Sequence, residues 1–133
     1  MSILKKISIL SFLFVAIQAT SAFAQVPNEI IVSFNTGDSK MLSEYFNQNV
    51  ELVVMDNDNV YSKAQAEQIV AGFFSSFTPA DEDAFSIIHE SGKQGAKSVI
   101  GKLKTTKGNF RVYFLLKKDG SKEYIHQLRI EKQ

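Results

Sequence analysis

Hydrophobic residues between positions 25 and 50 recur at helical spacing and predict two short helices. Ile30, Ile31 and Phe34 form one apolar stripe, and Gly37 is suited to end the helix that carries it. Asp38 can cap a second helix, whose apolar positions also return after one turn. These positions are Met41, Leu42, Tyr45 and Phe46.

From residue 50 the pattern changes to a β-hairpin that is followed by a longer helix. Residues 50–55 are β-prone, the polar run 56–59 is typical of a turn, and Val60 resumes an extended stretch. Ser62 and Gln65 form a capping box, which marks the start of the longer helix. Its apolar face carries Ile69, Val70, Phe73, Phe74 and Phe77, and Pro79 ends it.

Four more strands are predicted after this helix, at about residues 84–90, 96–105, 109–117 and 122–131. The turn signals between them are Ser91-Gly92-Lys93, Lys107-Gly108 and Asp119-Gly120. Connections this short favour an antiparallel meander. The pattern therefore predicts an α+β fold with the order α-α-β-β-α-β-β-β-β, in which three helices from the N-terminal half pack on an antiparallel sheet.

The first 24 residues carry the pattern of a removable export signal. Lys5 and Lys6 precede the apolar run from Ile7 to Ile17, and Ala22-Phe23-Ala24 is a cleavage pattern for signal peptidase. The apolar run is shorter than the roughly 20 residues that a membrane-spanning helix needs. We therefore expect residues 1–24 to be a signal peptide and residues 25–133 to be a single domain, exported to the periplasm or secreted.

Composition after cleavage limits the partners of the domain. Removing Lys5 and Lys6 from 15 basic residues leaves 13 against 14 acidic ones, a net charge of −1. This balance argues against nucleic acid and against an anionic membrane surface as partners. The chain has no cysteine, so we expect neither a lipoprotein anchor nor a disulfide.

The order of elements resembles the nuclear transport factor 2-like (cystatin-like) superfamily, in which a curved sheet wraps its helices into a cone. More narrowly, the export signal, the Val50–Ser62 hairpin, the Phe73-Phe74 helix and the closing strand Tyr124–Ile130 resemble an exported bacterial family, domain of unknown function 4783. The superfamily contains steroid isomerases, dehydratases, polyketide cyclases and many non-catalytic binding or dimerising modules. The resemblance therefore implies the fold and leaves the activity open.

Strand alternation places both histidines on the predicted inner side of the cone. His89 shares its parity with Phe85, and His126 shares its parity with Leu128. Because an imidazole titrates near neutral pH, His89, His126 and the phenol of Tyr45 are candidate catalytic residues of a cofactor-free isomerase or hydrolase. Satisfied core or rim positions are the competing interpretation of both histidines.

The aromatic interior of the cone supports a non-catalytic hypothesis, in which it holds a small apolar ligand. The candidate ligand-binding residues are Phe34, Phe46, Phe73, Phe74, Phe77 and Phe114. The same rings can fill the core instead, which a domain of this size without disulfides needs for its stability.

The opposite face of the predicted sheet also carries apolar side chains, which indicates a docking surface for a second copy or another partner. Ile88, Ile100, Tyr113, Leu115 and Ile125 take the outward parity on neighbouring strands. A contiguous exposed apolar patch of this kind marks an interaction site.

No residue pattern indicates a metal or a cofactor. The run 56–59 lacks the glycine and glutamate of a calcium loop, and two histidines without cysteine give no zinc pattern. The run 91–95 lacks the spacing of a phosphate-binding loop. The sequence therefore favours a non-catalytic small-ligand-binding or protein-interaction module over an enzyme.

Overall fold

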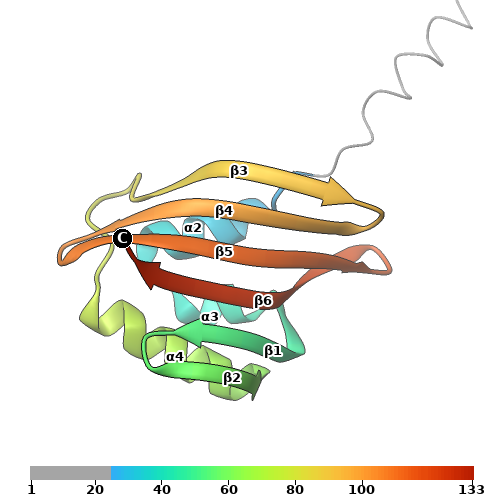
Figure 1. Ribbon diagram of the computed structural model, residues 1–133, viewed down its shortest axis with the longest axis horizontal. Coiled ribbons are helices and arrows are strands. Elements are labelled where there is room, and N and C mark those ends of the chain that lie inside the picture. The colour runs from blue at the N-terminus through green and yellow to red at the C-terminus, as the bar shows by residue number, and fades with distance from the viewer. Residues whose placement is uncertain (1–24) are drawn as a thin grey trace, which may run out of the picture.

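The sheet has the strand order β2-β1-β6-β5-β4-β3, so the strand that comes after all the others in sequence lies near its centre (Figure 1). The computed structural model describes residues 25–133, and the predicted signal peptide lies outside the described residues. The helices are α2 (Asn28–Thr36), α3 (Ser39–Ser43) and α4 (Lys63–Ser76). The strands are β1 (Phe46–Val54), β2 (Asn57–Ser62), β3 (Phe85–Lys93), β4 (Ala96–Thr105), β5 (Gly108–Asp119) and β6 (Lys122–Lys132).

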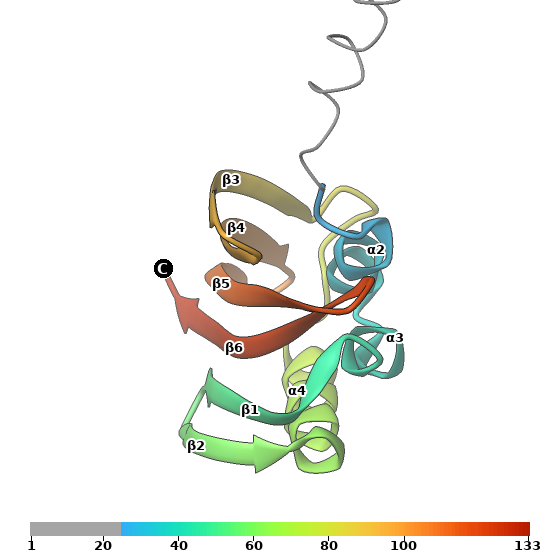
Figure 2. The same ribbon diagram turned by 90° about the vertical axis from the view of Figure 1, so that its right-hand side faces the viewer.

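All three described helices lie on one side of the sheet, and the described elements leave its other side uncovered (Figure 2). We call the helix-covered side the inner face and the uncovered side the outer face. Ile30 and Phe34 of α2 and Val70 of α4 are buried beneath the helices. None of the helices within residues 25–133 is long and apolar enough to cross a membrane.

The predicted helix ends are confirmed. Gly37 follows α2 in the left-handed region with φ 68°, and the Asp38 side chain caps α3. Ser62 and Gln65 form the capping box of α4. The second helix is shorter than the apolar spacing suggested, because α3 ends at Ser43 and Phe46 already begins β1.

The C-terminal meander is confirmed, and strands β3 to β6 pair antiparallel in sequence order. One pairing differs from the expected antiparallel sheet, because β1 runs parallel to β6 with Leu52 opposite Leu128. Turn signals reveal only which neighbouring strands form hairpins, whereas this pair joins strands far apart in the sequence. The sheet is therefore mixed.

A cluster of phenylalanine rings fills the space between the inner face and the helices. Phe34 stacks on Phe85 with ring centroids 4.7 Å apart and on Phe114 at 6.1 Å. Phe73 meets Phe110 edge to face at 5.0 Å. Close aromatic packing of this kind leaves little free volume, so the interior of the cone is a core.

Candidate functional site

The six phenylalanines expected to bind a ligand are core residues. Phe34, Phe46 and Phe114 are at most 1% exposed, Phe73 and Phe74 are also buried, and half-buried Phe77 packs against this core. None of the six lines any of the four cavities described in residues 25–133. These rings therefore fill the cone and do not surround a pocket in it.

A β-bulge reverses the predicted orientation of His89. Ile87 pairs with Gly101 and His89 pairs with Ile100, so Ile88 is an extra residue between the two pairs. One inserted residue moves the side chains that follow it to the other face of the strand. His89 is therefore exposed on the outer face, and the prediction that it faces into the cone is wrong.

A second bulge lies at His126. Leu115 pairs with Gln127 and Leu116 pairs with Ile125, which leaves His126 as the extra residue of β6. Ile125 is 0% exposed on the inner face, so its predicted place on the outer apolar surface is wrong. His126 itself is half-buried at the bulge.

The candidate catalytic residues are not brought together. His89 on β3 and His126 on β6 are separated by two strands, so roughly 14 Å of sheet lies between their backbones at about 4.8 Å per strand. The phenol of Tyr45 donates a hydrogen bond to Glu29 Oε2 at 2.9 Å and ties the segment before β1 to α2. The hydroxyl group of Tyr45 is therefore engaged by Glu29 on α2.

The largest of the four cavities described in residues 25–133 is lined mainly by the β3–β4 and β5–β6 hairpins. Both hairpins extend beyond the helices at one end of the sheet (Figure 1). We call this cavity the mouth cleft. It has a volume of about 530 Å³ and lies between the two hairpins and the residue that leads into α2. Its lining residues are Gln25, Glu90, Gly92, Lys93, Gln94, Gly95, Ala96, Lys97, Leu116, Lys118 and Glu123.

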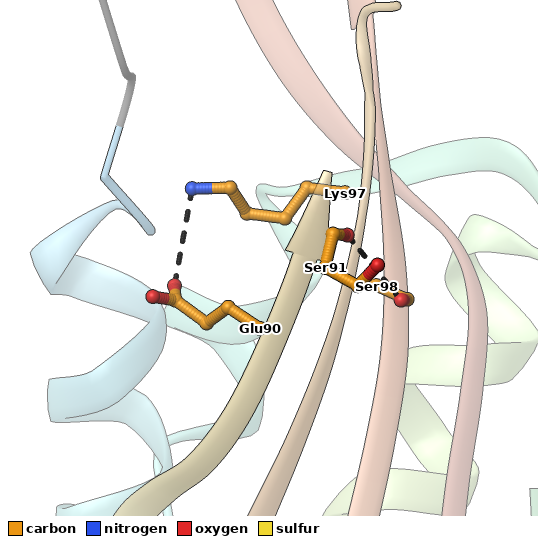
Figure 3. A network of polar contacts seen from close by, with 4 residues as sticks. All are labelled: Glu90, Ser91, Lys97 and Ser98. Atoms are coloured by element: carbon orange, nitrogen blue, oxygen red, sulfur yellow. Dashed lines mark hydrogen bonds and ion pairs between the residues drawn. The ribbon is translucent and has the colours of Figure 1, made fainter. Parts of the chain in front are cut away.

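Glu90 and Lys97 form an ion pair on the β3–β4 wall of the mouth cleft. Glu90 lies opposite Val99 and Lys97 lies opposite Leu116, and both apolar partners are buried on the inner face. Lys97 Nζ is 3.8 Å from Glu90 Oε1, and Figure 3 shows both side chains on the side of the strands that faces α2. Beyond the end of the helices, inner-face positions thus carry charged side chains.

Glu123 lies on the β5–β6 wall, opposite Lys118. It also borders a second cavity of about 370 Å³, which Tyr45 and Tyr124 help to line. Glu123 Oε2 is buried and has no hydrogen-bond partner among the described residues. A buried carboxylate oxygen is costly without a partner, so this position favours a cation or a hydrogen-bond donor.

Sequence reasoning missed the mouth cleft. One indication was available: Lys118 lies two residues after the buried Leu116 at the end of β5, so both side chains point to the inner face. The inward orientation of Glu123 could not be deduced in the same way. It shares its parity with Ile125, which the bulge at His126 places on the inner face.

The outer face carries rows of side chains that cross the central strands. One row contains His89, Ile100, Tyr113 and Arg129, and the next contains Ser91, Ser98, Leu115 and Gln127. Ile100, Tyr113 and Leu115 are half-buried, and Ile88 at the bulge is 59% exposed. We call these four the outer apolar patch. Lys102, Arg111, Arg129 and Glu131 lie beside it on the same face.

No group of three or more histidine, aspartate or glutamate side chains within residues 25–133 is arranged to hold a metal ion. β1 and β2 are joined by Met55 and Asp56, and β3 and β4 by Gln94 and Gly95. Most of the two predicted turns, residues 56–59 and 91–93, therefore belongs to strands β2 and β3. Gln94 and Gly95 at the β3–β4 turn have φ values of 50° and 81°, as a two-residue hairpin turn requires.

Comparison with known proteins identifies relatives of the same fold. The sequence profile described as "Domain of unknown function (DUF4783)" matches residues 27–131. A crystal structure of a DUF4783 family protein from Bacteroides ovatus is 34% identical, with a TM-score of 0.74 over 81% of this chain and 96% of that chain. No curated protein matches the sequence.

More distant structures share the fold alone. A domain of unknown function with a cystatin-like fold from Nostoc punctiforme is 8% identical, with a TM-score of 0.60 over 80% of this chain and 72% of that one. A candidate calcium/calmodulin-dependent protein kinase type II association domain from Thiobacillus denitrificans is also 8% identical, with a TM-score of 0.64 over 80% and 90% of the two chains. These neighbours establish the nuclear transport factor 2-like, cystatin-like fold that the sequence resembles.

Proposed function

Because this chain belongs to the DUF4783 family and its cone is filled by side chains, we propose that it is a non-catalytic interaction module that forms a homodimer through its outer face. The observation that carries the proposal is the outer apolar patch on the side of the sheet that no described helix covers. The histidine-based enzyme has no comparable support, because His89 and His126 lie on separate strands with two others between them.

The arrangement of the patch matches the anatomy of protein interfaces. Such interfaces have an apolar, often aromatic centre and a polar rim. Here Ile100 and Tyr113 are direct cross-strand neighbours, and Leu115 lies two residues further along β5. Arg129 and Glu131 form an ion pair at 3.4 Å beside the patch. A second copy placed with twofold symmetry would cover the apolar centre of both sheets with one contact.

The name of the Thiobacillus neighbour gives a further reason to test assembly first, because that protein is described as an association domain. At 8% identity this shows only that one protein of the same fold carries a name that refers to association. The outer apolar patch of this chain is the argument that the proposal depends on.

Sedimentation velocity at micromolar to millimolar concentrations tests the proposal. We expect a dimer, and we expect Ile88→Lys and Leu115→Lys to convert it to a monomer because each buries a charge at the interface. Met55→Lys is the matched control: Met55 is 55% exposed against 59% for Ile88, but it lies at the tip of the β1–β2 hairpin.

All variants should keep the circular dichroism spectrum of the parent protein. A folded protein that stays monomeric at the highest concentration contradicts the proposal. So does a dimer that Met55→Lys disrupts as strongly as Leu115→Lys.

A further inference from the structure

We infer that the mouth cleft is a binding site for a primary ammonium group, and that the α-amino group of Gln25 supplies this group once the chain is cleaved after Ala24. The inference is independent of the proposed dimer, since the mouth cleft lies on the inner face. It rests on the predicted export signal, which places the new N-terminus at one of the residues that line the cleft.

The first argument is the position of Gln25. It precedes α2 and lies in the mouth cleft together with Glu90 and Glu123, although these two residues belong to different hairpins. Cleavage of the preceding peptide bond would convert the backbone amide of Gln25, which carries no charge, into an ammonium group. That positive charge would arise between two walls that each carry a carboxylate.

The second argument is the unsatisfied oxygen of Glu123. Oε2 is buried without a hydrogen-bond partner among the described residues, and a carboxylate in that state gains most from a charged donor. Glu90 already has Lys97 as a partner at 3.8 Å, so the carboxylate oxygen that lacks a hydrogen-bond partner is that of Glu123. The α-ammonium group of Gln25 could therefore donate to Glu123, from which Glu90 is separated by two strands.

The other cations of the cleft are Lys93, Lys97 and Lys118. Lys118 is the competitor, because it lies opposite Glu123 in the β5–β6 register and could reach it by a rotamer change. An α-ammonium differs from this lysine in having no side-chain rotamers to order, and the residue that follows it, Val26, is buried.

The cyclisation of an N-terminal glutamine allows the binding of its α-amino group to be measured. At an N-terminus the neutral α-amine attacks the side-chain amide carbon, the amide C–N bond breaks, and ammonia leaves with the displaced proton as the pyroglutamate ring closes. A protonated amine cannot attack. An α-ammonium held by Glu123 should therefore cyclise more slowly. At pH 8, close to the ordinary pKa of an α-amine, raising that pKa by one unit lowers the neutral fraction by about fivefold.

The experiment uses the full chain, expressed with its own N-terminal segment and purified after processing. Intact mass spectrometry first reports the N-terminal residue and then follows the loss of ammonia with time at pH 8. We expect a start at Gln25 and cyclisation at least fivefold slower than in Glu123→Gln. Glu131→Gln, a carboxylate on the outer face, should behave as the parent protein. Lys118→Met should slow cyclisation further, because it removes the competing cation.

Three results would overturn the inference. They are a mature protein that does not begin at Gln25, equal cyclisation rates in the parent protein and Glu123→Gln, and an equal acceleration by Glu131→Gln. Thermal unfolding of each variant checks that the fold is retained. If Glu123→Gln loses the fold, Lys118→Met provides the test, and a cyclisation rate equal to that of the parent protein then counts against the inference.

Discussion

The ring of Phe85 lies directly over Gly101 on the neighbouring strand, so closely that a methyl group built on Gly101 would lie 2.5 Å from two of its carbons. Phe85 in turn stacks on Phe34 of α2 at 4.7 Å. Because Gly101 has no side chain, the ring of Phe85 can lie over it and pack the edge strand β3 against the core.

Gly101→Ala should destabilise the protein by about 1–3 kcal/mol, because the ring must leave its place against Phe34. Gly72→Ala is the control: Gly72 lies in α4 with nothing within 4 Å of an added methyl group, and it should stabilise by about 0.5–1 kcal/mol. Urea unfolding measures both changes. Equal effects of the two substitutions would show that the close contact with Phe85 has no energetic role.

The capping box of α4 gives a second prediction. Ser62 Oγ accepts a hydrogen bond from the backbone of Gln65 at 3.2 Å, and Gln65 Oε1 accepts one from the backbone of Ser62 at 3.1 Å. Ser62→Ala should cost about 1 kcal/mol of unfolding free energy. Ser75→Ala, near the other end of the same helix, should change it by only a few tenths. A loss that is the same for both serines would argue against the cap.

The hydrogen bond between Tyr45 and Glu29 predicts a dependence of stability on pH. Hydrogen bonding with its own backbone and then with Tyr45 lowers the pKa of Glu29 below its ordinary value of 4.5. Burial, followed by the bond to Glu29, raises the pKa of Tyr45 above 10.0. Because the pKa of Glu29 is lower in the folded state, this group stabilises the fold above pH 4.5. The stabilisation is lost as the pH falls through the folded pKa. Because the pKa of Tyr45 is higher in the folded state, its stabilising contribution is complete below pH 10. It is lost as the pH rises through the folded pKa.

The pair is therefore intact between these two limits. Tyr45→Phe should lower stability more at pH 7 than at pH 3, and it should return the pKa of Glu29 towards 4.5 in an NMR titration. In the Glu29→Gln background the Tyr45→Phe effect should no longer change over this acidic range. A Tyr45→Phe effect of equal size at pH 3 and pH 7 would exclude the carboxylate as the partner that matters.

His126 provides a prediction at the β6 bulge. Burial, and to a smaller extent the charge of Lys117, lowers its pKa below 6.5, while Asp119 opposes the shift. Because the folded pKa lies below the unfolded one, the stabilising contribution is complete above about pH 6.5 and is lost as the pH falls. Lys117→Met should raise the pKa of His126 and Asp119→Asn should lower it, as followed by the imidazole proton shifts. Shifts in the same direction would disprove this account.

Local features of the fold were predictable and pairings between distant strands were not. The capping box at Ser62 and the glycine at position 37 follow from short stretches of sequence, because a cap is built by neighbours. Each hairpin was also expected, but the turns at 55–56 and 94–95 lie beside the predicted positions. The two bulges at Ile88 and His126 leave no such signal. Each adds one residue to a strand whose composition is otherwise ordinary, and each reverses the faces that simple alternation assigns.

The same two bulges explain which predicted orientations of candidate site residues were wrong. The faces of His89, His126 and Ile125 were assigned by alternation across a bulge. Ile100, Tyr113 and Leu115 lie on unbroken stretches of β4 and β5, where the predicted outward orientation agrees with the register. The charged walls of the mouth cleft depend on how far the hairpins extend past the helices, which periodicity alone does not show.

The central position of β6 has a consequence for the timing of folding. Glu51 and Gln127 are 76 residues apart, yet their side chains are hydrogen-bonded across the β1–β6 pair at 2.7 Å. The first hairpin and α4 therefore gain their sheet partner only after every other strand has been synthesised, and contacts of such long range slow folding. Until then the chain lacks the strand that joins its two halves. A nascent chain that still lacks β6 would therefore be without a closed sheet until its synthesis is complete.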